Sequence, residues 1–254
     1  MVDERLGAFH MSVASPHRRA LLRAALGGIV LGGGTSLLAG CAAPLGQQAR
    51  GTPAEAIATE GSAVLHNGLG GRGAAVGFGT RHALTCAHVL EGGATGARLR
   101  RADGAEAEAV LVGRSARMDL AVLCVPRGFL AAAPRASDLP REGEAVWAAG
   151  APGFGPAIAQ GRVEAPDAEM PGFGRGFTAR MPALMGYSGG PVVDASGQLM
   201  GLTAALPSPG AAGALAFLTG ADLDGLARRD RQVFVLGIRR AEAEAQRLLG
   251  RTAA

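Results

Sequence analysis

The chain has 254 residues, enough for one large domain or two small ones with a hydrophobic core of ordinary size. Hydrophobic residues make up 48% of it and there are 41 glycines, a composition that favours many tight turns over a helical bundle. All 25 basic residues are arginine, against 21 acidic residues, which gives a net charge of +4. Such a small excess does not indicate a nucleic-acid-binding protein, because those proteins cluster basic charge on one face.

Residues 1–40 have the pattern of an export signal. Paired arginines at 18–19 are followed by two leucines and another arginine, which resembles the twin-arginine signal. The apolar run at 24–40 is too short and too rich in glycine to span a membrane. It ends in the sequence LAGC at 38–41, which resembles a bacterial lipobox. We therefore expect cleavage before Cys41, lipidation of its thiol, and an exported protein anchored to the cell envelope, on the periplasmic face. An ordinary signal peptide or signal anchor with an incidental cysteine is the alternative.

Residues 41–60 are rich in Ala, Gly, Gln and Pro without a sustained hydrophobic period, and we expect a flexible tether there. From Gly61 onward, short apolar runs separated by glycine are typical of a barrel or sandwich of strands. In the first half this pattern predicts strands at 62–65, 74–78, 82–85, 97–101, 107–114 and 120–125. After a connection at 129–141, it predicts strands at 144–149, 157–163, 176–179, 191–194, 199–204 and 214–218.

Two segments near the end of the chain, 221–229 and 241–251, favour helix. Between them, residues 233–238 are apolar, and their periodicity fits strand and helix equally. The sequence has no repeat of fixed period and no alternation of strands with helices, which argues against a parallel α/β fold.

The chemistry is indicated by a serine in a glycine-rich turn, Ser188 in the sequence GYSGGP. Flanking glycines let the chain turn sharply and keep bulk away from the hydroxyl. They also free the backbone N–H groups of Gly186 and Ser188 to point at an oxygen above the serine, as an oxyanion hole requires. A serine needs a base to become nucleophilic. His88, after a predicted strand, and Asp119, before one, supply a base and a group to orient it.

Three segments occur in one order: TCAH at 85–88, DLAVL at 119–123 and GYSGGP at 186–191. They resemble the trypsin-like (chymotrypsin-fold) serine proteases, and more closely the bacterial HtrA-type branch. The resemblance implies an all-β fold of two antiparallel six-stranded β-barrels, at about 61–128 and 142–220, with a C-terminal helical tail at 221–254. HtrA-type members usually append a PDZ domain, and no second module follows here. The resemblance therefore leaves the oligomeric state open.

The same resemblance implies a serine endopeptidase in which Ser188 is the nucleophile, His88 the base and Asp119 the group that fixes the His88 tautomer. Tyr187 stands where the HtrA-type branch usually has Asn, a change we expect to be tolerated because the backbone matters more there.

Substrate-binding residues are also implied by this family. The strand at Leu202, Thr203 and Ala204 would pair with the substrate backbone and line the primary pocket. Pro182 stands six residues before the serine, where enzymes that cleave after basic residues have an acid. A small or medium apolar residue is therefore the expected preference.

The cysteines and histidines do not indicate a disulfide or a metal site. Cys124 lies about 16 Å along a strand from Asp119, whereas Cys86 is two residues from His88, which must touch Asp119. Because a disulfide needs Cα atoms within about 7 Å, we predict two buried free thiols. The scattered cysteines and histidines lack metal-ligand spacing, so we expect no metal and no cofactor.

Three functions remain open. The first is an endopeptidase acting on protein or peptide substrates of the envelope, tethered to the membrane by its lipid. The second is a catalytically silent trypsin-fold lipoprotein that captures peptides by strand addition. The third is an enzyme that stays inactive until a partner orders the loop at 172–185.

Overall fold

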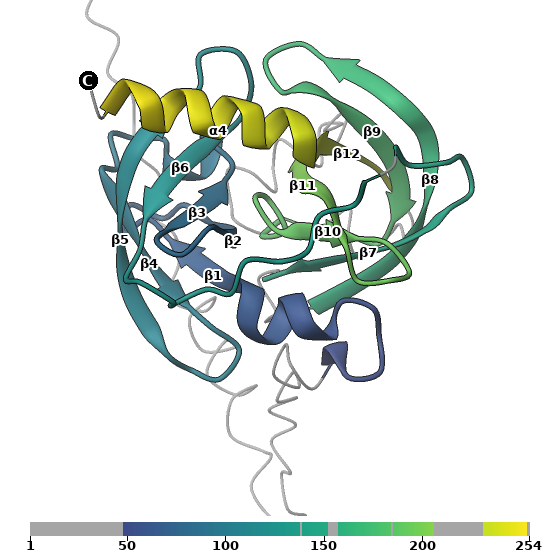
Figure 1. Cartoon of the computed structure of the whole chain (residues 1–254), viewed down its shortest axis with the longest axis horizontal. Coiled ribbons are helices and arrows are strands. Elements are labelled where there is room, and N and C mark those ends of the chain that lie inside the picture. The colour runs from purple at the N-terminus through teal and green to yellow at the C-terminus, as the bar shows by residue number, and fades with distance from the viewer. Residues whose placement is uncertain (1–47, 138, 152–156, 184, 206–230, 253–254) are drawn as a thin grey trace, which may run out of the picture. The chain divides into compact units, whose positions relative to one another are not determined.

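Two closed six-stranded barrels form the fold of this chain in a computed structural model, which describes residues 48–252 apart from 138, 152–156, 184 and 206–230 (Figure 1). In the first barrel the strand order is β1-β2-β3-β6-β5-β4, and every neighbouring pair is antiparallel. Its strands are β1 (Ser62–His66), β2 (Arg72–Phe78), β3 (His82–Thr85), β4 (Gly96–Arg100), β5 (Glu106–Arg114) and β6 (Ala121–Cys124).

The second barrel has the order β10-β11-β12-β9-β8-β7 and is also antiparallel throughout. Its strands are β7 (Ala145–Gly150), β8 (Ala157–Met170), β9 (Gly174–Met181), β10 (Pro191–Val193), β11 (Leu199–Ala205) and β12 (Arg231–Gly237). The predicted all-β class with two antiparallel barrels and a C-terminal helix is confirmed.

Side chains along the strands of the first barrel alternate between the interior and the solvent. In β4, Ala97 and Leu99 are buried, whereas Arg98 and Arg100 face solvent. Arg98 lies opposite Glu108 of β5, with 3.1 Å between Nε and Oε1, so the exposed face carries cross-strand ion pairs. Leucines from four strands fill the interior, each contributing about 2 kcal/mol by burial: Leu65, Leu84, Leu99 and Leu123.

The boundary predicted for the second barrel was wrong. Its closing strand is β12, which pairs with β11 on one side and β9 on the other, so the barrel extends to 237 and not to 220. The strand predicted at 214–218 and the helix predicted at 221–229 lie outside the described residues. Residues 233–236 are all buried, because one face of β12 packs in the second barrel and the other toward the first. Burial on both faces removes the alternation by which a strand is recognised.

The end of the segment expected to be a tether is folded. From Gln48 the chain is partly helical, ending in a π-helical turn, η2 (Ile57–Gly61). Ile57 packs in the core of the first barrel, and Ala58 belongs to a small apolar cluster with Ala49 and Ala149 of β7. Its buried residues are mostly alanines at irregular spacing, which is why the sequence shows no hydrophobic period. None of the helices among the described residues is long and apolar enough to cross a membrane.

The C-terminal helix, α4 (Ile238–Thr252), follows directly from β12 and lies across both barrels (Figure 1). It buries Ile238, Ala241, Ala245 and Leu248, whose spacing of three or four residues defines one helix face. Leu248 packs over Gly113 of β5, where an added Cβ would lie in ordinary van der Waals contact with the leucine, 3.5 Å from its Cδ2 atom.

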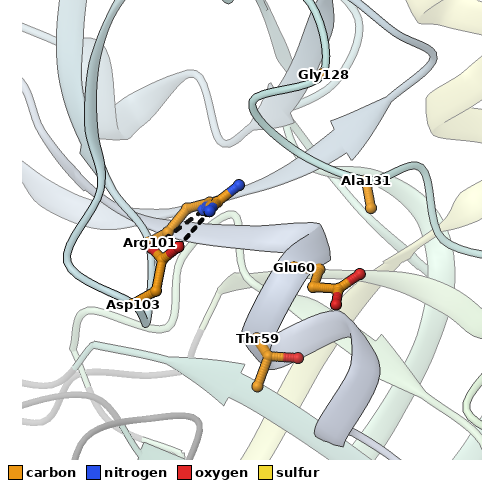
Figure 2. Close-up of a pocket in the computed structure, with 6 residues that line it drawn as sticks. All are labelled: Thr59, Glu60, Arg101, Asp103, Gly128 and Ala131. Carbon is orange, nitrogen blue, oxygen red and sulfur yellow. Dashed lines mark hydrogen bonds and ion pairs between the residues drawn. The ribbon is translucent and has the colours of Figure 1, made fainter.

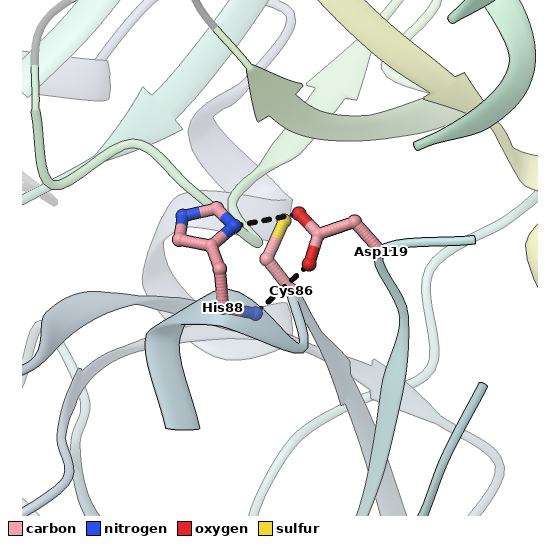
Figure 3. Close-up of side chains that lie close together, drawn as sticks. All are labelled: Cys86, His88 and Asp119. Atoms are coloured by element: carbon pink, nitrogen blue, oxygen red, sulfur yellow. Dashed lines mark hydrogen bonds and ion pairs between the residues drawn. The ribbon is translucent and has the colours of Figure 1, made fainter. Parts of the chain in front are cut away.

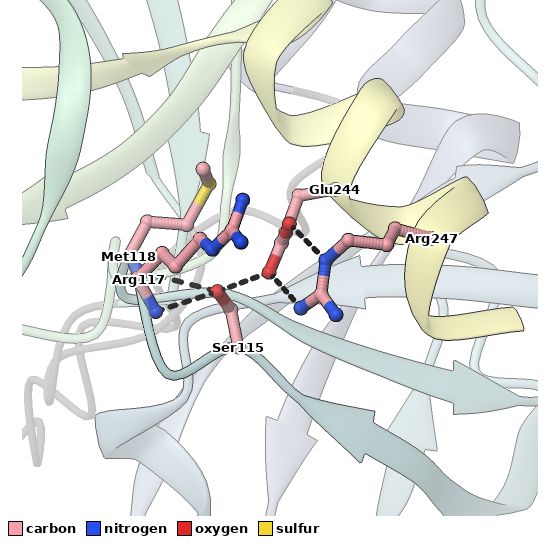
Figure 4. Close-up of polar contacts among 5 residues, drawn as sticks. All are labelled: Ser115, Arg117, Met118, Glu244 and Arg247. Carbon is pink, nitrogen blue, oxygen red and sulfur yellow. Dashed lines mark hydrogen bonds and ion pairs between the residues drawn. The ribbon is translucent and has the colours of Figure 1, made fainter. Parts of the chain in front are cut away.

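One carboxylate on α4, Glu244, is only 5% exposed and points into the fold. It accepts hydrogen bonds from Arg247 Nε at 2.7 Å and from the hydroxyl of Ser115, before β6, at 2.5 Å (Figure 4). The Arg247 guanidinium, with a smaller contribution from Ser115, lowers the pKa of Glu244 to about 2, against the opposing effect of burial.

Acid should therefore weaken the docking of this helix. Because the folded pKa lies below the ordinary value of 4.5, Glu244 stabilises the fold fully above about pH 5 and loses that contribution as the pH falls toward 2. In denaturant titrations, Glu244→Gln is expected to lower the free energy of unfolding by about 2–3 kcal/mol at pH 6 and by much less at pH 2.5. Glu108→Gln, in an exposed ion pair, should have little effect at either pH. A Glu244→Gln deficit that stays constant with pH would contradict this assignment.

Candidate active site

His88 and Asp119 are brought together by the pairing of β3 with β6. Thr85 at the end of β3 lies opposite Ala121 at the start of β6, so the residues just beyond those strand ends meet. His88 begins a short 3-10 turn, η3 (His88–Leu90), and Asp119 stands two residues before β6.

Both oxygens of the Asp119 carboxylate hold the same histidine (Figure 3). His88 Nδ1 lies 2.6 Å from Oδ2, and the His88 backbone N–H donates to Oδ1 at 2.9 Å. Asp119 is 7% exposed, whereas the His88 side chain is 38% exposed, and Figure 3 shows the second ring nitrogen pointing away from Asp119. The pair therefore presents Nε2 of an oriented imidazole outward.

The turn that carries Ser188 is bonded to the first barrel. The Ser188 carbonyl accepts the Ala74 N–H of β2 at 2.8 Å. The Thr203 carbonyl of β11 accepts both the Gly189 N–H at 2.8 Å and the Cys86 thiol at 3.3 Å. The residue after Ser188 and the residue two before His88 therefore share one acceptor, although the two segments lie in different barrels.

The predicted oxyanion-hole residues lie in a sharp turn. Gly186 has φ +102°, in a region that disfavours any residue with a side chain, and its carbonyl accepts the Ala151 N–H at 3.1 Å. Within the part of the chain that the structure describes, no acceptor takes the N–H of Gly186 or of Ser188. Backbone N–H groups in a turn of this kind are the donors that an oxyanion hole uses.

The sequence matches the family described as "Trypsin-like peptidase domain" over residues 61–202, more than half of its length. The chain belongs to the trypsin-like peptidase family. The family as a whole, not its HtrA-type branch, is what this match shows, and the branch stays a prediction.

Solved structures share the fold of this trypsin-like peptidase at low sequence identity. The structure titled "Crystal structure of Rv3671c protease, inactive form" is 20% identical with a TM-score of 0.59, and the alignment covers 78% of this chain and 93% of that one. An inactive serine-to-alanine mutant of Rv3671c from M. tuberculosis H37Rv is 19% identical with a TM-score of 0.58, covering 76% and 90%. Comparison with curated proteins finds no significant match.

Tyr187 anchors the serine turn of this peptidase, a role that the sequence did not reveal. Its side chain is 2% exposed, and burial raises the pKa of its phenol well above the ordinary value. The ring lies against Gly150 at the end of β7, where an added Cβ would stand 2.4 Å from the Tyr187 Cγ atom. The aromatic side chain between the two proposed oxyanion donors is therefore packed in the core of the second barrel.

Cys86 is a second residue whose role the sequence did not indicate. Its thiol is buried, and its sulfur, a His88 ring nitrogen and an Asp119 oxygen all lie within 4.8 Å of one another (Figure 3). Burial and the neighbouring carboxylate raise its pKa well above the usual value, so the thiol stays neutral. A protonated thiol is a poor metal ligand and Nδ1 is hydrogen-bonded to Asp119, so these donors favour a hydrogen-bonded cluster over a metal site. The sequence offered one indication that Cys86 lies near the site, because it stands two residues before His88, just after the end of β3.

Cys86 and Cys124 form no disulfide, as predicted. Both thiols were expected to be buried, but Cys124 is only half-buried. The predicted lipidation site, Cys41, lies outside the described residues.

The predicted substrate-binding residues are not brought together in a described pocket. Leu202, Thr203 and Ala204 are buried in β11, and Pro182 is exposed beyond β9. The Thr203 hydroxyl oxygen is buried without a hydrogen-bond partner among the described residues. One pocket among the described residues lies elsewhere, on the first barrel beside η2, and shares no residue with the proposed site (Figure 2): Thr59, Glu60, Arg101, Asp103, Gly128 and Ala131.

A side chain at Gly189 should disrupt the junction between the barrels. Its φ is +81°, and an added Cβ would lie 2.3 Å from the Ala74 carbonyl oxygen and 2.4 Å from Thr85 Oγ1. We expect Gly189→Ala to cost at least about 3 kcal/mol of unfolding free energy in denaturant titrations. Gly143→Ala is the matched control, because Gly143 has φ +76° with no atom within 4 Å of the added Cβ, and it should cost about 1 kcal/mol. Equal costs at the two positions would show that the contact at Gly189 is unimportant.

Proposed function

We propose that this trypsin-like peptidase is a serine endopeptidase in which Ser188, His88 and Asp119 form the catalytic triad. The proposal rests on the two hydrogen bonds that orient His88 against a buried Asp119. His88 Nδ1 lies 2.6 Å from Oδ2, and the His88 backbone nitrogen lies 2.9 Å from Oδ1. The hydrogen bond between Ala74 and Ser188 supports it, because it fixes the serine turn against the barrel that holds the histidine.

In this mechanism, His88 Nε2 takes the proton from the Ser188 hydroxyl as the oxygen forms a bond to the substrate carbonyl carbon. The carbonyl oxygen becomes negative and accepts hydrogen bonds from the N–H groups of Gly186 and Ser188. As the C–N bond breaks, the imidazolium gives its proton to the leaving amine. Water then attacks the acyl-enzyme, with His88 again as base, and releases the acid and free Ser188.

A fluorophosphonate probe tests this function, since such probes phosphonylate activated serines. The purified soluble domain is expected to be labelled, and to cleave peptides in a digest of unfolded proteins analysed by mass spectrometry. Folded wild-type protein that binds peptides but is neither labelled nor active would instead be a silent peptide-binding member of the family. Labelling that appears only after a partner is added would support an enzyme that is activated by ordering of a loop.

We further propose that the substrates are exposed or unfolded proteins of the cell envelope, with a small or medium apolar residue before the cleaved bond. The absence of an acid at Pro182 supports this preference, and the LAGC sequence supports attachment through Cys41. In a bacterial host, Cys41→Ser is expected to move the protein from the membrane fraction to the soluble fraction. Unchanged fractionation of that variant would contradict the lipid anchor.

A further inference from the structure

The turn that delivers Asp119 is closed by its own backbone. The Ser115 N–H donates to the Leu120 carbonyl at 2.9 Å, and the Leu120 N–H donates to the Met118 carbonyl at 2.8 Å. Inside the turn, the Ser115 hydroxyl oxygen accepts the N–H groups of Arg117 at 3.0 Å and Met118 at 3.2 Å. The orientation of this one hydroxyl therefore affects the residues immediately before Asp119.

The Ser115 hydroxyl uses all of its hydrogen-bonding capacity. A serine hydroxyl has one hydrogen to donate and two lone pairs to accept with. Both acceptor sites point to the turn, and the hydrogen goes to Glu244 Oε1 on α4, at 2.5 Å (Figure 4). Because an ionised carboxylate can only accept, it holds the hydroxyl hydrogen toward α4 and leaves both lone pairs for the turn.

The Glu244 carboxylate is itself fixed. Arg247, one helical turn further along α4, donates to both of its oxygens, at 2.7 Å from Nε and 2.5 Å from Nη2. Figure 4 shows the Ser115 and Arg247 side chains approaching the carboxylate from opposite sides. Charge-assisted, two-pronged contacts of this kind are geometrically specific. The helix and the turn, 129 residues apart in sequence, are thus joined at one buried carboxylate.

We propose that Glu244, acting through Ser115, is a positioning residue for Asp119, so that catalysis depends on the docked C-terminal helix. This inference rests on the proposed function above. Asp119 must receive the His88 backbone N–H and ring N–H at the same time, and a misplacement of about 1 Å at a catalytic group costs on the order of 100-fold in rate. The Glu244–Ser115 contact restrains the turn against such a shift.

Kinetics of the full domain on a peptide substrate test this role. Ser115→Ala removes the hydroxyl, and Glu244→Gln replaces an acceptor oxygen by an amide that can donate to Ser115. Both variants are expected to lower kcat by about 10- to 100-fold and to leave KM within about threefold. Ser115→Thr keeps the hydroxyl and should restore most of kcat. The matched control is Glu242→Gln on the same helix, since Glu242 pairs with Arg135 and not with the turn, and it should retain wild-type kcat.

A second readout does not depend on activity. The proton in the hydrogen bond between His88 Nδ1 and Asp119 gives a far-downfield NMR resonance, assigned by its loss in His88→Ala. We expect it to broaden or vanish in Glu244→Gln and to persist in Glu242→Gln. A lower melting temperature with an unchanged resonance and unchanged kcat would make Glu244 merely structural and overturn the inference. If wild type shows no Ser188-dependent hydrolysis, the proposed function fails, and the resonance alone decides the positioning role.

Discussion

Ser188→Ala is expected to reduce kcat for peptide hydrolysis by on the order of 10⁴- to 10⁶-fold, because alanine has no oxygen to form the acyl-enzyme. Binding of peptide should be nearly unchanged, since the backbone donors of Gly186 and residue 188 remain. Fluorophosphonate labelling should disappear completely. The kinetic measurement is the initial rate of peptide cleavage under saturating substrate, with intact folding checked by thermal melting.

Ser196→Ala is the matched control for the nucleophile. Ser196 lies in an exposed turn of the same barrel, where its hydroxyl bonds to Asp194 at 2.7 Å. Full activity and labelling are expected in this variant. If Ser188→Ala kept wild-type turnover, the hydrolysis would come from another residue or a contaminant, and the triad would be wrong.

Asp119→Asn is expected to lower kcat by about 10⁴-fold while leaving the fold intact, because it selects the wrong histidine tautomer. The Oδ1 atom accepts the His88 backbone N–H, so the asparagine oxygen must stay there. The asparagine NH₂ group then faces Nδ1, which must be unprotonated to accept from it. The proton is left on Nε2, and that nitrogen cannot take the proton of Ser188.

Asp167→Asn serves as the control for this substitution, because Asp167 is exposed and pairs with Arg175 on the β8–β9 hairpin. It should retain full activity. Asp119→Asn with near-normal kcat at neutral pH would remove Asp119 from the mechanism.

The strands of the first barrel could be predicted closely from sequence, because most of them are short apolar runs bounded by glycine or charged residues. The strand predicted at 82–85, for example, coincides with β3. The β8–β9 hairpin was predicted too short, since β8 runs on to Met170 through register shifts near Pro166. Beyond Val163 its residues are largely half-buried or exposed, so the backbone pairing with β9 continues there without the hydrophobic alternation that would reveal a strand.

The candidate site, too, could be predicted from the sequence only in part. Ser188, His88 and Asp119 were identified from local sequence, because each sits in a short motif whose residue types serve its proposed chemistry. Three contacts could not be predicted, because each joins segments distant in sequence or follows from burial. They are Tyr187 against Gly150, Cys86 beside Asp119, and Glu244 bonded to Ser115.

By itself, the sequence determined most strands of the first barrel, the order of the three motifs and the glycines that the serine turn requires, because these depend on residue types at short spacing. The two-barrel arrangement was implied by the family resemblance that those motifs carry. Only the tertiary structure decided that both oxygens of Asp119 hold His88, that β12 closes the second barrel, and that α4 reaches the turn before Asp119. Those features depend on which distant backbone and side-chain groups satisfy one another once water is excluded, and a hydrogen-bonding partner 129 residues away leaves no periodic mark in the chain.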